Sequence, residues 1–108
     1  MSATPPAYRH VVLFKFKDET TAETVVEIEK GFAALCAELS VVKGFEWGRN
    51  ESPENLNLGF THCFIVSFAE AAGRDVYLPH PAHQAFCRRY LDPHLEKACV
   101  VDFPAHGE

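Results

Sequence analysis

The stretch from Val76 to Phe86, VYLPHPAHQAF, places one tyrosine and two histidines within seven residues. Histidine titrates near neutral pH, so His83 could act as a general base and take a proton from a carbon next to a carbonyl group. Tyr77 could donate a hydrogen bond to that carbonyl and stabilise the enolate. A structural interpretation is also open, in which His83 bonds a buried carbonyl and the Tyr77 hydroxyl lies in water.

The other histidine of this stretch, His80, is interpreted as structural. It precedes Pro81, a residue suited to the first position of a helix, so its ring is placed to bond a backbone group at the helix start. The spacing of His80 and His83 could also supply half of a metal site. No carboxylate lies at a matching distance in the sequence, so we expect no metal site here.

Four segments carry the patterns of β-strands. Residues 9–17 (RHVVLFKFK) and 60–68 (FTHCFIVSF) alternate, so that every second side chain shares a face. Residues 44–50 (GFEWGRN) predict a short strand and residues 97–103 (KACVVDF) predict the last one. A loop rich in Pro, Asn and Gly is expected over residues 51–59.

Helical patterns fill the remaining length. Residues 18–40 carry an apolar stripe at helical spacing, and Thr20 followed by Glu23 predicts a capping box. A shorter helix over residues 69–78 must stop near Pro79, and a second segment restarts over residues 80–91.

The order strand, helix, strand, strand, helix, strand predicts an α+β fold. We expect a ferredoxin-like βαββαβ sandwich with an antiparallel sheet. Its first and third strands are expected to be neighbours, and this pair is expected to run parallel. Both strands carry a histidine near their start, His10 and His62, so the prediction puts the two imidazoles side by side at one end of the sheet.

Composition excludes several classes of protein. The chain has 108 residues, 47% of them hydrophobic, which fits one domain over residues 9–104 preceded by a flexible arm over residues 1–8. A net charge of −5 without a basic stripe argues against a nucleic acid or membrane-surface partner. No secretion signal or long apolar run is present, so a cytoplasmic location is expected. The four cysteines form no C-x-x-C pair, so we expect free thiols and no zinc.

The second face of the predicted sheet is also apolar, and one layer of helices cannot cover both faces. An exposed apolar sheet would associate, and a second copy of the same sheet is the usual cover. We therefore expect a homodimer through the sheet faces, formed by Val11, Leu13, Cys63, Ile65 and Ser67.

Three segments, RHVVLFKF, WGRNESPENLNLGFTHCFIVSF and YLPHPAHQAF, resemble the stress-responsive α/β-barrel (Dabb) family from about His10 to Phe103. The resemblance implies a ferredoxin-like protomer and a barrel made by two sheets in a dimer. Most members have no assigned activity, and one plant enzyme closes a linear polyketide by aldol condensation without metal or cofactor.

The resemblance also implies roles for individual residues. The catalytic histidine of that enzyme falls on His83 and its catalytic tyrosine on Tyr77. Its pocket positions fall on His10, Val12, Phe14, Ile28, Phe32, Phe64, Phe86 and Val100. The sequence departs from the enzyme at Ile28 and Glu29, where aromatic residues are expected, at Cys87, where glycine is expected, and at Pro79.

Two functions follow as expectations. The first is a homodimeric stress-responsive domain with an apolar small-molecule pocket between sheet and helices and no assigned activity. The alternative is a cofactor-independent, polyketide cyclase-like lyase that acts on a small carbonyl compound, with His83 as general base and Tyr77 as hydrogen-bond donor.

Overall fold

The computed structural model describes residues 7–106, and its elements follow the expected order. The strands are β1 (Tyr8–Phe16), β2 (Gly44–Arg49), β3 (His62–Phe68) and β4 (Leu95–Pro104). The helices are α1 (Ala22–Glu38), α2 (Ala71–Tyr77) and α3 (Pro81–Phe86), and α3 continues into a π-helical turn, η1 (Cys87–Leu91). Residues 1–6 of the expected arm lie outside the described residues.

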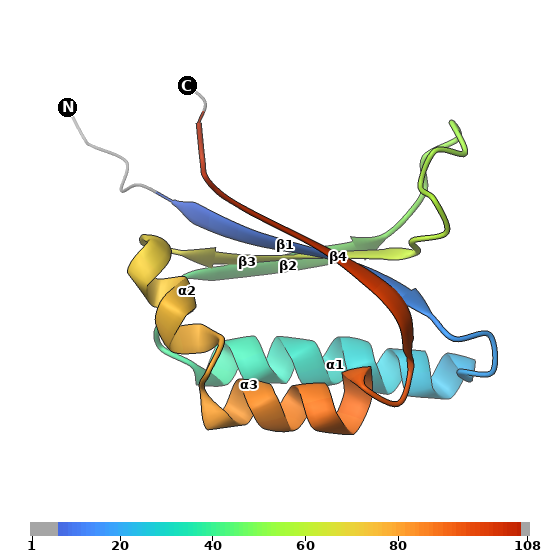
Figure 1. The fold of residues 1–108 in the computed structure, drawn as a ribbon, viewed down its shortest axis with the longest axis horizontal. Coiled ribbons are helices and arrows are strands. Elements are labelled where there is room, and N and C mark those ends of the chain that lie inside the picture. The colour runs from blue at the N-terminus through green and yellow to red at the C-terminus, as the bar shows by residue number, and fades with distance from the viewer. Residues whose placement is uncertain (1–6, 107–108) are drawn as a thin grey trace.

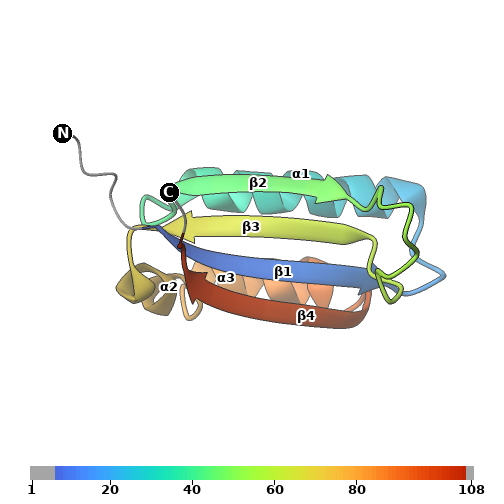
Figure 2. The same ribbon diagram turned by 90° about the horizontal axis from the view of Figure 1, so that it is seen from above.

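One four-stranded antiparallel sheet, in the order β2-β3-β1-β4, forms one layer of the molecule. The helices form the second layer, and α1 and α3 lie side by side against the same face of the sheet (Figures 1 and 2). The expected ferredoxin-like α+β fold is therefore confirmed. The described helices leave the opposite face of the sheet uncovered (Figure 1).

The expected parallel pairing of the first and third strands is wrong. The α1 crossover makes β2 run in the direction of β1, and β3 then returns antiparallel to both. His10 consequently pairs with Val66, whereas His62 pairs with Phe14. Four residues of strand separate the two positions by about 13 Å, so the two histidines lie at opposite ends of the same sheet face.

The expected alternation of buried and open side chains is confirmed in both central strands. Alternate residues of β1 and β3 point toward the helices and are buried, including both histidines. Together with α1, α2 and α3 they form one core, made of Val12, Phe14, Ile28, Phe32, Leu35, Cys36, Leu39, Phe64, Val66, Phe68, Tyr77 and Phe86.

Helix starts and ends differ from the expected ranges by a few residues. The cap of α1 is Thr21, whose Oγ1 accepts from the Thr24 backbone N–H at 3.1 Å, so the capping box predicted from Thr20 is wrong. Thr21, one residue after the expected cap, has the extended backbone conformation that a capping residue needs. At the start of α3 the expectation holds, because Pro81 opens the helix and His80 Nδ1 accepts from the Ala82 N–H at 3.0 Å.

Candidate functional site

Tyr77 and His83 lie against each other where α2 passes into α3. Their ring centroids are 4.4 Å apart with an interplanar angle of 45°. Tyr77 is the last residue of α2 and His83 is the third residue of α3, so the break at Pro79 and Pro81 folds the chain back and brings the rings together. The structure thus places the two sequence-predicted residues in direct contact.

The contacts of His83 fix which ring nitrogen carries its proton. Nδ1 lies 2.9 Å from the carbonyl oxygen of Leu78, and a carbonyl can only accept, so Nδ1–H is the donor. In the neutral ring Nε2 therefore carries a lone pair. Burial lowers the pKa of His83 below its ordinary value of 6.5, and the nearby His10 and His80 lower it further. The imidazole is neutral near pH 7, as a general base must be.

The Tyr77 hydroxyl is buried and makes no hydrogen bond of good geometry, although the thiols of Cys36 and Cys87 lie close enough to act on it. The residue is 0% exposed, and burial raises the pKa of its phenol well above the ordinary value, so the hydroxyl keeps its proton. A buried hydroxyl without a partner destabilises a protein by about 1–3 kcal/mol. An unpaired donor next to a neutral base is the arrangement that could bind a carbonyl oxygen and take a neighbouring proton.

His10 lies on the other side of Tyr77, with ring centroids 5.8 Å apart in an edge-on arrangement. Its Nδ1 donates to Asp102 Oδ1 at 2.7 Å, directly across the β1–β4 pairing. Arg74 Nη1 donates to Asp102 Oδ2 at 3.2 Å and to the Tyr8 hydroxyl at 2.7 Å. The chain of contacts from Arg74 to His83 runs from the edge of the sheet into the core.

The pocket positions implied by the family resemblance are mostly packed against one another. Six of them belong to the core, where Phe32 stacks on Phe64 at 4.6 Å and contacts Phe86 at 5.0 Å. Val100 differs, because it lies on the edge strand β4 and is 54% exposed. In this structure the Tyr77 side of the candidate pair is closed by side chains, whereas His83 is half-buried.

A second polar cluster, formed by Glu29, Arg49, Thr61 and His62, lies at the opposite end of the sheet. Glu29 Oε2 accepts from His62 Nε2 at 2.7 Å and from Arg49 Nε at 2.8 Å. The Thr61 hydroxyl lies 2.8 Å from His62 Nδ1, so both ring nitrogens of this histidine are satisfied. Trp47 stacks nearly parallel to the His62 ring, at 6.1 Å and 8°.

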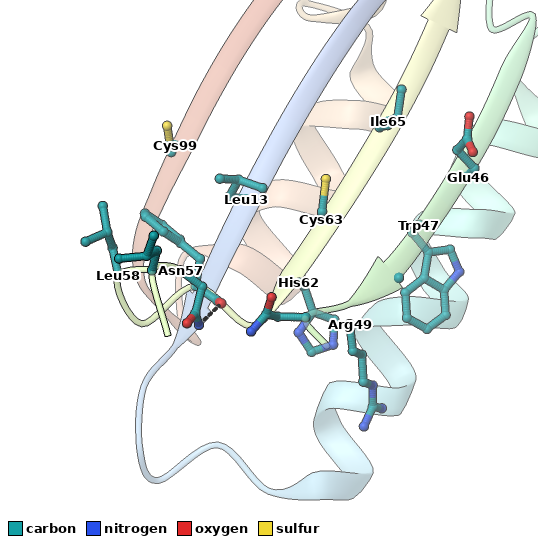
Figure 3. A pocket seen from close by; sticks show the side chains of 14 residues that line it. Leu13, Glu46, Trp47, Arg49, Asn57, Leu58, His62, Cys63, Ile65 and Cys99 are labelled. Carbon is teal, nitrogen blue, oxygen red and sulfur yellow. Dashed lines mark hydrogen bonds between the residues drawn. The ribbon is translucent and has the colours of Figure 1, made fainter. Parts of the chain in front are cut away.

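A groove of about 580 Å³ lies beside this second cluster, on the sheet face that the helices leave open. Leu13, Cys63, Ile65 and Cys99 line it from three strands, and Trp47, Arg49 and His62 line it where β2 ends and β3 begins (Figure 3). The open face is therefore apolar at its centre, as the sequence predicts.

Two further features concern metals and membranes. Within residues 7–106, no three His, Cys, Asp or Glu side chains come together to hold a metal ion. None of the helices in this part of the chain combines the length and apolar character needed to cross a bilayer. The four cysteines are free.

Sequence reasoning missed three partners of the candidate residues. Cys87 follows His83 by four residues, the spacing that puts two side chains on one helix face, and its Sγ lies 3.6 Å from His83 Nε2. Asp102 could have been found only from the register of β4 against β1. Glu29 stands out as an acidic residue beside the apolar stripe of α1, and its burial with His62 was not predicted.

Comparison with known proteins places the chain in a family. Residues 8–105 match the family model described as the stress responsive A/B barrel domain, Dabb. The chain is 38% identical over 95 residues to the stress-response A/B barrel domain-containing protein HS1 of Arabidopsis thaliana, covering 88% of this chain and 86% of HS1. It is 31% identical over 97 residues to olivetolic acid cyclase of Cannabis sativa, covering 90% and 95% of the two chains.

Solved structures agree with this placement. The crystal structure of At3g17210 from Arabidopsis thaliana superposes with a TM-score of 0.87 at 36% identity, covering 94% of this chain and 97% of that one. A dimeric ferredoxin-like protein of unknown function from Bacteroides fragilis gives a TM-score of 0.72 at 26% identity, covering 92% and 96%. The protein belongs to the stress responsive A/B barrel domain family.

Proposed function

We propose that the protein transfers a proton on a small, apolar carbonyl compound without a cofactor, as a cyclase-like lyase does. The observation that carries the proposal is the buried, unpaired Tyr77 hydroxyl beside a neutral His83 whose Nε2 lone pair faces away from its backbone anchor. His83 Nε2 takes the proton next to the carbonyl, and Tyr77 donates to the oxygen on which negative charge develops. The likeness to olivetolic acid cyclase, whose name describes ring closure, supports the same choice of chemistry.

The substrate pocket of this proposal lies between the sheet and the helices. It is formed by His10, Val12, Phe14, Ile28, Phe32, Phe64, Phe86 and Val100. These side chains are mostly aromatic or aliphatic, which favours an apolar substrate with few polar groups. Because the space is closed here, substrate entry requires the α2–α3 connection or the Phe86 side chain to move.

Exchange of α-protons for deuterium tests the proposal without knowledge of the natural substrate. The probe is 4-phenylbutan-2-one in D₂O, followed by NMR. His83→Asn keeps an amide N–H for the Leu78 carbonyl but removes Nε2, so we expect the protein-dependent exchange rate to fall about 10²–10⁴-fold. Tyr77→Phe is expected to lower it about 10²-fold.

The matched control is His106→Asn, an exposed histidine near the end of the described chain, which is expected to exchange the probe at the wild-type rate. Equal rates for wild-type protein and His83→Asn would refute the role of His83.

A second candidate function is a module that binds an apolar small molecule and does no chemistry. The complete burial of Tyr77 favours it, because a closed site needs no catalytic role. Backbone amide NMR separates the candidates: binding of 4-phenylbutan-2-one that shifts the signals of residues 77–87, with no exchange above that of buffer, supports the module.

We also propose that two copies associate through the open sheet face, as a homodimer. Leu13, Cys63 and Ile65 form the centre of this face, and the helices cover only the other face. Light scattering should give twice the 12.1 kDa mass of one chain, and Ile65→Lys should give the single-chain mass. Val26→Lys, on the exposed side of α1, is the control and should remain dimeric. A wild-type protein that scatters as one chain would overturn the proposal.

The proposed setting is the reducing cytoplasm. The four free thiols support it, since such groups persist there and oxidise outside it.

A further inference from the structure

The base of the proposed site touches a second reactive group, the thiol of Cys87. Cys87 Sγ lies 3.6 Å from His83 Nε2, on the same side of the helix one turn later. Because Nδ1–H of His83 is held by the Leu78 carbonyl, Nε2 is the acceptor and the thiol is the donor. A thiol bonded to an imidazole that a third group orients is the arrangement of a cysteine nucleophile with its base.

The backbone at Cys87 supports a special role for this residue. Cys87 opens the π-helical turn η1, in which the Asp92 N–H bonds to the Cys87 carbonyl oxygen five residues earlier, at 2.9 Å. Such turns are rare, and they occur frequently at functional sites. The helix is therefore irregular at the residue that contacts the base.

The third component of a nucleophilic site is a donor for the oxygen that becomes negatively charged. Tyr77 supplies one, because its hydroxyl is buried, has no partner and belongs to the ring that packs on His83 at 4.4 Å. The Tyr77 ring also packs on Phe68 at 5.3 Å, and the hydroxyl is buried close to the thiols of Cys36 and Cys87. Hydrogen-bond donors are strongest toward an oxyanion in such surroundings.

We propose that Cys87, His83 and Tyr77 form a cysteine nucleophile site that accepts the acyl group of an activated ester or thioester of an apolar acid. His83 Nε2 takes the thiol proton as Sγ bonds to the carbonyl carbon, and the carbonyl electron pair moves to oxygen, which accepts from Tyr77. When the carbonyl re-forms, the bond to the leaving group breaks and the leaving atom takes the proton from Nε2. Water then releases the acid by the same steps and regenerates the thiol.

The resting site holds a neutral thiol and a neutral imidazole. Burial and the nearby Asp92 raise the pKa of Cys87, against a smaller lowering by Arg88, while burial lowers the pKa of His83. The thiolate therefore forms only during attack on a bound acyl group. This behaviour predicts slow reaction with small alkylating agents and faster reaction with an apolar ester that occupies the site.

This inference goes beyond the proposed proton transfer, which does not use Cys87. The two are tested by different probes. A ketone has no leaving group, so α-proton exchange reports proton transfer alone, whereas a covalent acyl group on the protein reports the nucleophile alone. If the wild-type protein fails to exchange the ketone protons, its acylation can still be measured. If it fails to become acylated, its proton exchange can still be measured.

The experiment uses the full chain and 4-nitrophenyl hexanoate, with intact mass and peptide mapping after a short incubation. We expect one hexanoyl group on Cys87, with nitrophenolate released in an equal amount before slower turnover. His83→Asn should lower the acylation rate about 100-fold and Tyr77→Phe by a similar factor. Cys99→Ser, on the open sheet face, is the matched control and should be acylated like the wild type.

Two results, besides the one for Cys87→Ala given below, would overturn the inference. One is a hexanoyl group spread over several cysteines or lysines of the wild-type chain. The other is acylation of folded His83→Asn at the wild-type rate. The mapping on wild-type protein decides the site even if Cys87→Ala fails to fold, and a folded Cys87→Ala that still takes one hexanoyl group would contradict the inference equally.

Discussion

The helix-covered face of the sheet holds a buried histidine at each end, and the two ends differ in how completely their polar atoms are paired. At one end His62 bonds Glu29 and Thr61, with Arg49 completing the cluster. At the other end His10 bonds Asp102, but the neighbouring Tyr77 hydroxyl has no partner. Both ends contain an imidazole and a carboxylate, so the residue types alone do not separate them.

The difference distinguishes the Tyr77 end as the one with an unpaired buried polar atom. Buried polar groups are almost always hydrogen-bonded, so each exception needs an explanation. At the His62 end no buried polar side-chain atom of the described residues is left without a hydrogen-bond partner. At the Tyr77 end the hydroxyl of Tyr77 is an unpaired donor and the neighbouring His83 is a base. The proposed function is placed at this end for that reason.

The largest expected effect comes from breaking the fully paired end. Glu29→Ala leaves the buried His62 without the acceptor of its Nε2–H and removes the partner of Arg49. Leaving a buried group without its charged hydrogen-bond partner lowers the free energy of unfolding by about 3 kcal/mol, and the Arg49 side chain, 55% exposed, can bond water instead. Urea unfolding measures the change, and Glu27→Ala, an exposed residue of the same helix, should stay within about 0.5 kcal/mol of the wild type. A similarly small change for Glu29→Ala would mean that this end is not a structural network.

Asp102→Ala tests the corresponding carboxylate at the other end. The Asp102 side chain is 19% exposed against 7% for Glu29, so water can replace part of what it provides to His10 and Arg74. We expect a loss of about 2 kcal/mol in the free energy of unfolding. Asp75→Ala is the control, because Asp75 also pairs with Arg74 but lies in solvent. A larger loss for Asp102→Ala than for Glu29→Ala would reverse the ranking of the two ends.

Tyr77→Phe should raise the stability of the protein while it lowers activity. The substitution removes a buried hydroxyl that bonds nothing, so the free energy of unfolding should increase by about 1 kcal/mol. Tyr8→Phe is the contrasting variant, because the Tyr8 hydroxyl accepts from Arg74 at 2.7 Å and its removal should lower stability. A Tyr77→Phe protein that is less stable than the wild type would show that the hydroxyl has a partner in solution.

The alternation of apolar residues was sufficient to predict the sheet and its buried face, because burial of every second residue depends only on the strand itself. The pairing direction was not predictable in this way. It depends on the direction in which α1 and the loop over residues 50–61 lead the chain into the next strand. Because that direction was predicted wrongly for β3, His62 was predicted at the wrong end of the sheet. The candidate pair was found from the residue types of the stretch and from the family resemblance, whereas the contact between Tyr77 and His83 across Pro79 could not be derived from their spacing.

The partners of the candidate residues could not be predicted by local spacing alone. Asp102 is 92 residues from His10 in the sequence and meets it only through the register of β4 against β1. Cys87 was visible as a departure from the family pattern, but its contact with Nε2 depends on the tautomer of His83, which the Leu78 carbonyl fixes. The sequence indicates which residue types are present, whereas the hydrogen-bond partners decide what each can do.

The smallest effect is a pH dependence that belongs to the Tyr77 end alone. The pKa of His83 is lowered in the folded protein by burial and by His10 and His80, whereas in the unfolded chain it returns toward 6.5. Above pH 6.5 both states are neutral and His83 contributes nothing. As the pH falls below 6.5, the unfolded chain binds a proton that the folded protein does not, so stability is lost until the pH passes the folded pKa. His83→Asn lacks this proton, while Asp102, His10, His80 and the Glu29 cluster are present in both proteins and cancel in the comparison. The difference in unfolding free energy between wild type and His83→Asn should therefore shrink, or change sign, as the pH is lowered from 7.

A difference that stays constant with pH would mean that the His83 ring is hydrated in the folded state, and it would remove the basis for a neutral base beside Tyr77.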